Sequence, residues 1–181
     1  MGALIDQKPI KLVVSLIFKD DMVIKKTEDI LRKKYGEFDS HERTLPFDFT
    51  DYYDKEFGKP LKRKLMCFKK PVNKEKIADI KIATNRIEAR FRKKGNRTVN
   101  IDPGYITEAK LVLLTTKDYT HRVYVGKRVF AESTLFFQDG TFKPWPWTYP
   151  DYASEELISY FNKVRDLYIK EMRGESSCQA G

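Results

Sequence analysis

Hydrophobic and polar residues alternate along two neighbouring runs in the second half of the chain, on either side of Gly126-Lys127. Alternation with a period of two is typical of strands, and a glycine-led pair between two such runs is typical of a two-residue type II′ turn. That turn sets a register in which Val125 pairs with Arg128 and His121 lies opposite Glu132. The pattern therefore predicts that an imidazole and a carboxylate touch on one face of a sheet.

Other patterns occupy the first half of the chain and its C-terminal end. Residues 11–18 are almost continuously apolar and rich in branched side chains, which is typical of a strand buried on both faces. Apolar residues then recur at helical spacing over residues 21–34, a helix that Asp20 or Asp21 can cap and that Gly36 ends. The same criteria predict a strand over residues 61–68, a helix from Asn73 to about Arg92, and a last helix opened by Ser154.

A turn motif stands between these two halves, at Asp102-Pro103-Gly104-Tyr105. Pro at the first central position and Gly at the second are typical of a type II turn. Thr107 then predicts a helix that carries Leu111, Val112 and Leu114. Because ligands commonly bind where a strand ends before a helix, Asp102 and Tyr105 are candidate site residues. An ordinary turn is the alternative interpretation.

Together, these elements predict a single α/β domain over residues 1–173 and a disordered tail over residues 174–181. Strands and helices alternate first, and an antiparallel meander follows, with its second turn at Asp139-Gly140. We therefore expect a mixed β-sheet flanked by helices, with a ferredoxin-like core, a C-terminal antiparallel meander and a packing helix.

The expected solubility and cellular compartment follow from the absence of two kinds of segment, a membrane-spanning run and an export signal. No apolar run approaches the ~20 residues that a membrane-spanning helix needs, and we expect no membrane partner. Without an export signal, Cys67 and Cys178 are expected to be reduced thiols in the cytoplasm. Asp48 and Asp51 lie three residues apart and could hold a hydrated magnesium ion, although helix capping explains Asp51 equally well. No metal site or cofactor is assigned from these patterns.

The net charge of +9 is concentrated in one segment, because residues 59–94 contain 14 basic residues and three acidic ones. Such a segment can collect phosphates by displacing counterions, whereas a solvated helix face is the usual explanation of a charge run. Asn85 and Glu88 are expected on such a solvated face. The candidate ligand-binding residues are Lys62, Arg63, Lys64, Arg86, Arg90 and Arg122, with Trp145 and Trp147 available for stacking. The two tryptophans could instead fix a connection against the core.

Five separated segments, in order, resemble a known prokaryotic family. They are PFDFTDYY from Pro46, NIDPGYIT from Asn100, TKDYTHRVYVG from Thr116, FAESTL from Phe130 and PWTYPDY from Pro146. The family is the domain of unknown function numbered 4416, and the resemblance covers residues 8–172. Some members are labelled GTP-binding. A phosphate-binding loop of the form GxxxxGK[ST] is absent, because Arg128 follows Gly126-Lys127, so the resemblance implies no ordinary P-loop GTPase.

Three hypotheses about function follow. The first is a binding protein for a phosphate-bearing ligand, either a nucleotide or RNA, without a P-loop. The second is a small hydrolase or transferase, in which His121, oriented by Glu132, moves a proton while Asp102 and Tyr105 position the substrate. The third is a scaffold or assembly subunit, including a homo-oligomer, with an exposed apolar patch around Trp145 and Trp147.

Overall fold

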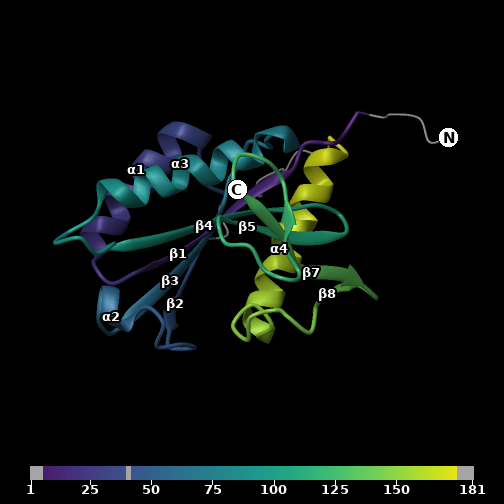
Figure 1. Cartoon of the computed structure of the whole chain (residues 1–181). Helices are drawn as coiled ribbons and strands as arrows, with labels where there is room; N and C mark the ends of the chain where they lie inside the picture. Colours follow the sequence, from purple (N-terminus) through teal and green to yellow (C-terminus); the bar gives the residue numbers. More distant parts are fainter. Residues whose placement is uncertain (1–5, 40–41, 175–181) are drawn as a thin grey trace, which may run out of the picture.

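A computed structural model describes residues 6–39 and 42–174, and in it one eight-stranded sheet runs through the molecule (Figure 1). The strand order is β2-β3-β1-β4-β5-β7-β6, and β8 pairs with β7. The strands are β1 (Lys11–Phe18), β2 (Arg43–Phe47), β3 (Leu61–Cys67), β4 (Val99–Ile106), β5 (Lys110–Thr115), β6 (Val123–Tyr124), β7 (Phe130–Gln138) and β8 (Thr141–Pro144). The helices are α1 (Asp21–Tyr35), α2 (Asp54–Phe57), α3 (Ile77–Arg90), preceded by the 3₁₀ turn η1 (Lys74–Lys76), and α4 (Glu155–Met172).

The first half of the sheet confirms the expected ferredoxin-like core. The chain order β1-α1-β2-β3-α3-β4 gives the spatial order β2-β3-β1-β4, in which β3 lies between β1 and β2. Every pair of neighbouring strands in the described sheet is antiparallel. The fold class is as expected, and its sheet is antiparallel throughout instead of mixed in direction.

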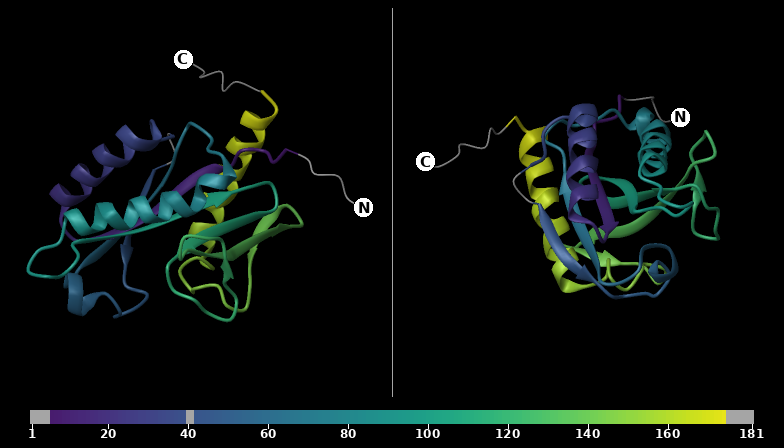
Figure 2. Two further views of the ribbon diagram at one scale, coloured as in Figure 1. Left: turned by 45° about the horizontal axis from the view of Figure 1, so that its top comes forward. Right: turned by 90° about the vertical axis from the view of Figure 1, so that its left-hand side faces the viewer.

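Helices cover both faces of this sheet (Figure 2). α1 and α3 lie side by side on one face, where Val23, Leu31 and Ile87 pack against alternate residues of β1 in one hydrophobic cluster. α4 covers the other face, where Leu157 and Val164 join a second cluster. β1 lies between the two layers, so all of its residues are buried, as its continuous apolar pattern predicts.

The predicted helix after Thr107 is wrong. β4 and β5 form a hairpin instead, and the sequence from Asp102 to Tyr105 lies inside β4 and is not a turn. Gly104 is required there for packing, because a Cβ atom at this position would lie 2.5 Å from the carbonyl oxygen of Val112. The Pro-Gly pair thus permits a close approach of two strands.

The predicted hairpin after β6 is present, but its register is wrong by one residue. Val123 pairs with Ala131 instead of Phe130, because the loop has three residues. Lys127 and Arg128 both have positive φ, and the amide of Val129 donates to the carbonyl oxygen of Gly126. The second hairpin, at Asp139-Gly140, has the predicted pairing of Phe137 with Phe142.

The two halves of the sheet meet along β4, and this junction positions the candidate site. β4 pairs with β1 along its whole length, but it pairs with β5 only from Gly104 to Ile106. Residues 99–103 therefore have no strand partner on the side of β5. We call this opening between β4 and the end of β5 the fork.

Two expectations concern residues outside the described part of the chain, namely the tail beyond residue 174 and Cys178. Cys67 is described, and it is a free, buried thiol in β3. No helix within residues 6–39 and 42–174 has the length and apolar composition needed to cross a membrane.

Candidate functional site: a cavity at the fork

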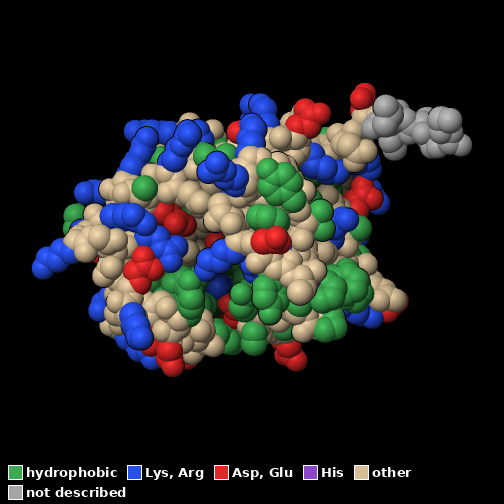
Figure 3. All heavy atoms as spheres, in the orientation of Figure 1, with side chains coloured by type: hydrophobic (Ala, Val, Ile, Leu, Met, Phe, Trp, Pro, Cys, Tyr) green, Lys and Arg blue, Asp and Glu red, His purple; other side chains and the backbone are tan. Residues whose placement is uncertain are grey.

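A cavity of about 570 Å³ opens at the fork, a size typical of small-molecule sites. Figure 3 shows a hollow near the middle of this face, with charged side chains inside it and hydrophobic side chains along its lower rim. Its charged lining residues are Arg63, Lys81, Glu88, Arg97, Asp102, Lys117, Arg122, Glu132 and Asp151. Both halves of the sheet contribute to this set, so the cavity depends on their junction.

One wall comes from α3, whose side chains replace the missing strand partner of β4. Glu88 accepts a hydrogen bond from the amide of Ile101 at 2.6 Å, and Lys81 donates to the carbonyl oxygen of the same residue at 3.1 Å. By the alternation of an antiparallel strand, Pro103 faces the same side, and it has no N–H group that would need a partner. Both backbone groups of Ile101 are therefore satisfied without a neighbouring strand.

Glu88 is predicted on a solvated helix face, and that prediction is wrong. Its side chain is only 9% exposed, and burial raises the pKa of its carboxyl group above the usual range. Lys81 is buried as well, and its ammonium group lies 3.4 Å from Asp102. The α3 wall therefore contains charged groups that have little contact with water.

A chain of hydrogen bonds continues this wall. Arg97 binds both carboxylate oxygens of Glu56, at 2.9 and 2.8 Å, and donates to Asn100 at 2.8 Å. Asn100 in turn donates to Asp102 at 2.6 Å. The bond to Arg97 lowers the pKa of Glu56, and the same bond raises the pKa of Arg97. These contacts hold Asp102 in place before any ligand arrives.

The opposite wall contains the predicted His121–Glu132 contact. The Nε2 atom of His121 lies 3.0 Å from one carboxylate oxygen of Glu132, and Arg122 donates to the same oxygen at 2.9 Å. The second oxygen of Glu132 is buried and has no hydrogen-bond partner in the described structure. Glu132 and Arg122 line the cavity, whereas His121 lies behind them, stacked on Trp147. The carboxylate, and not the imidazole, therefore faces the cavity.

Deeper in the cavity, Arg63 connects the two halves of the protein. Its guanidinium group lies 2.5 Å from Asp151, and both side chains are less than a tenth exposed. The same group lies over the rings of Phe47 and Tyr152, at 4.7 and 4.9 Å from their centroids. Stacking and charge pairing together fix this arginine.

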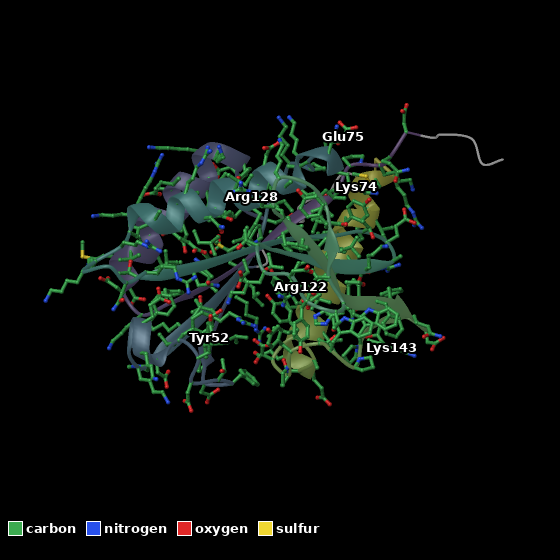
Figure 4. The ribbon with its side chains drawn as sticks, in the orientation of Figure 1. Tyr52, Lys74, Glu75, Arg122, Arg128 and Lys143 are labelled. Atoms are coloured by element: carbon green, nitrogen blue, oxygen red, sulfur yellow. The ribbon has the colours of Figure 1, made fainter. Side chains whose placement is uncertain are left out.

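Aromatic side chains form the rim. Phe49, Tyr52 and Tyr149 line the cavity and are more than half exposed. Lys117, from the loop after β5, donates to the hydroxyl of Tyr52 at 2.8 Å, which lowers the pKa of that phenol. Tyr52 and Arg122, labelled in Figure 4, come from opposite walls of the cavity. The mouth therefore combines exposed rings with a cation.

Other predicted site residues lie elsewhere. Tyr105 is on the opposite face of β4 from Asp102 and does not line the cavity, because residues an odd number apart in a strand face opposite sides. The indole N–H groups of Trp145 and Trp147 donate to the hydroxyl and the carbonyl oxygen of Ser133, and the two rings stack. Both tryptophans pack on β7 beside the cavity without lining it.

Asp51, one of the two carboxylates considered as magnesium ligands, has a cation as its partner. Asp51 pairs with Lys59, and no group of three or more metal-binding side chains occurs within the described ranges.

The candidate basic residues of segment 59–94 do not share one surface. Lys62 and Lys64 point toward α1 and pair with Asp21 and Glu28, whereas Arg63 points to the other face. Successive strand residues alternate between faces, so neighbours in the sequence cannot share one surface. Arg86 and Arg90 lie on the exposed side of α3.

Several cavity residues were missed from the sequence. On α3 they are Lys81, Asn85 and Glu88, whose spacing of four and then three residues is that of one helix face. This polar stripe beside the apolar stripe was the available signal. Arg97, Asn100 and Lys117 gave no comparable signal, because only the fold brings them together.

The family model described as Domain of unknown function (DUF4416) matches residues 8–168 of this chain. The matched range includes every residue that lines the cavity. No curated protein and no solved structure matches the chain.

Proposed function

The chain belongs to the family described as Domain of unknown function (DUF4416), and from the cavity we propose that it binds a small phosphate-bearing ligand of nucleotide size. The observation that carries this proposal is a cation at the cavity mouth without a carboxylate partner, beside exposed aromatic rings. The cavity volume of about 570 Å³ lies within the usual range for such ligands.

The cation is Lys117. Four other lining cations, Arg63, Lys81, Arg97 and Arg122, each have a carboxylate within 4 Å. Among the described contacts, the ammonium group of Lys117 meets only the neutral phenol of Tyr52. Arg122 donates to the backbone carbonyl oxygen of Lys117 at 3.2 Å, and both residues line the cavity. A phosphate group bound between them would receive charge-assisted hydrogen bonds.

The aromatic rim favours a ligand with a ring as well as a phosphate. Phe49, Tyr52 and Tyr149 present large ring surfaces to solvent at the mouth, where a base can stack on them. Asn85, Asn100 and the free oxygen of Glu132 provide polar groups that can recognise the edge of such a ring. A nucleotide combines all of these features.

Binding of nucleotides, measured by thermal shift and isothermal titration calorimetry, tests the proposal. Nucleotides are expected to stabilise the protein, and their nucleosides are expected to bind more weakly. Lys117→Ala should weaken nucleotide binding about tenfold or more, because it removes a hydrogen bond from a charged group. Lys143→Ala is the matched control, since Lys143 pairs with Asp139 outside the cavity. Equal affinity of nucleotides and nucleosides, or equal effects of the two variants, would contradict the proposal.

A second candidate function, a hydrolase or transferase, is favoured by the unpaired oxygen of Glu132. A buried carboxylate with one free oxygen at a cavity wall can accept a proton, and His121 and Arg122 would orient it. Glu132→Gln should then abolish phosphate release from a bound nucleotide while nucleotide binding persists. If the wild-type protein binds nucleotides without turnover at any pH, catalysis is rejected and the binding function is retained.

A further inference from the structure

The outer face of the two helices α1 and α3 is strongly basic, and its cations lack partners. We call this surface the helical face. It comprises Lys25, Lys26 and Lys33 of α1, Arg86 and Arg90 of α3, and Arg92 and Lys94 just after α3. All seven residues are exposed, and none forms an ion pair within the described structure. Figure 3 shows Lys and Arg side chains along the upper edge of the molecule, where these helices lie.

Several exposed cations on other surfaces form ion pairs. Lys62 contacts Asp21, Lys59 contacts Asp51 and Asp54, and Lys143 contacts Asp139. Lys127, on the β6–β7 loop, neutralises Asp79 of α3 and so removes an acidic group from the helical face. Asp29, an exposed acid of α1, lies 3.7 Å from Arg32, which is not one of the seven cations, so the helical face retains its excess charge.

The two arginines of α3 repel each other, although Arg90 also lies in the last turn, where a cation stabilises the end of the helix. Arg86 and Arg90 are four residues apart on the same side, and like charges at that spacing destabilise a helix by roughly 0.2–0.5 kcal/mol. The positions three and four residues from Arg86, on either side, carry Ile82, Ala83, Ala89 and Arg90, so no acid offsets the repulsion. A solvated helix would normally alternate the two signs of charge.

The two helices present these cations as one surface. Their apolar sides share one hydrophobic cluster on the sheet, so their outer sides point the same way (Figure 2). Lys93, just after α3, lies 3.7 Å from Asp20, which caps α1. The C-terminal end of α3 is therefore next to the beginning of α1, and the cations from the two helices are neighbours.

We propose that the helical face binds the phosphate backbone of a nucleic acid. The Cβ atoms of Arg86 and Arg90, four residues apart on α3, lie roughly 5–6 Å apart. The neighbouring helix α1 adds Lys25, Lys26 and Lys33 to the same face. Arginine is suited to phosphate because it donates two parallel hydrogen bonds. An anionic membrane fits less well, because a membrane-binding helix also needs an apolar surface. The apolar sides of both helices are buried, and Met22 is the large apolar residue that they expose.

Fluorescence anisotropy with labelled single-stranded and duplex RNA and DNA of about 20 nucleotides, titrated at several salt concentrations, tests this proposal. The full chain should bind with a steep salt dependence, because each phosphate that a cation neutralises releases counterions. The double variant Arg86→Gln/Arg90→Gln should lower the slope of log K against log salt by about 2, at about 1 for each cation removed. Both side chains are exposed, so the variant should fold, and circular dichroism checks this.

The matched control is Lys110→Gln/Lys143→Gln, which removes the same charge from β5 and β8. Equal losses of affinity in the two double variants would overturn the proposal, because binding would then depend on total charge alone. Binding to phosphatidylserine vesicles but to no nucleic acid would overturn it in favour of a membrane partner. The Lys117→Ala variant should bind RNA normally, which separates this surface from the proposed nucleotide cavity.

Discussion

The two halves of the sheet differ in how completely their strands pair. In the first half, β1 and β4 pair along their full length, from Lys11 opposite Ile106 to Phe18 opposite Val99. Across the junction to the second half, β4 and β5 pair only from Gly104 to Ile106. The charged and polar side chains of the cavity gather where pairing stops. In this fold, the candidate site lies where the sheet is incomplete and not at the end of a complete strand.

Two ion pairs between the ferredoxin-like core and the C-terminal part of the chain differ in their exposure to solvent. Arg63 of β3 pairs with Asp151, just before α4, and both side chains are buried. Arg43 of β2 pairs with Glu156 of α4, and both side chains are nearly half exposed. Each pair connects the ferredoxin-like core to the last helix, so the two pairs form a natural comparison.

The largest expected effect is from Asp151→Asn, which keeps the shape of the side chain and leaves the charge of Arg63 buried and unpaired. Removing one partner of a buried ion pair typically costs about 3–5 kcal/mol. We therefore expect the free energy of unfolding, measured by urea denaturation, to fall by about this amount.

Arg43→Gln is the control, because an exposed ion pair contributes about 0–1 kcal/mol. If Asp151→Asn lowers the free energy of unfolding no more than Arg43→Gln does, water in the cavity solvates the charge of Arg63. The junction would then be held by packing alone.

The core of the fold could be predicted from sequence because its signals are local. The continuous apolar run of β1 and the capping residues Asp20 and Ser154 report on their own elements, and the structure confirms them. The contact between His121 and Glu132 was also predicted, although from the wrong register. Its prediction succeeded because a loop of three residues displaced His121 without separating the two side chains.

The junction could not be predicted, because the structural roles of its residues depend on partners that are distant in the sequence. Pro103 and Gly104 have the local pattern of a turn, yet one faces the fork without an N–H group and the other lies against β5. Glu88 resembles a solvated helix residue until its partner, the amide of Ile101, is known. The sequence indicates that Pro-Gly favours a turn and that Glu favours an exposed helix face. It does not indicate that a strand partner is absent beside them.

The smallest expected effects concern Glu56 and Glu88, two carboxylates that contact the same arginine, Arg97. The bond to Arg97 lowers the pKa of Glu56, whereas burial raises the pKa of Glu88. Ionised Glu56 therefore stabilises the fold above its unfolded pKa of about 4.5, and this contribution is lost as the pH falls through its folded pKa. For Glu88 the sign is opposite, because its contribution is present below the unfolded pKa and is lost as the pH rises through the folded pKa.

Urea denaturation between about pH 3.5 and 7.5 checks these signs. The stability of the wild type relative to Glu56→Gln should increase with pH, and its stability relative to Glu88→Gln should decrease. In an Arg97→Gln background the Glu56 dependence should become much smaller, since the side-chain bond to Arg97 is its largest cause. The Glu88 dependence should persist, since burial is its largest cause. If both dependences vanish together, Glu88 responds to Arg97 and not to burial, and the α3 wall is open to water at the fork.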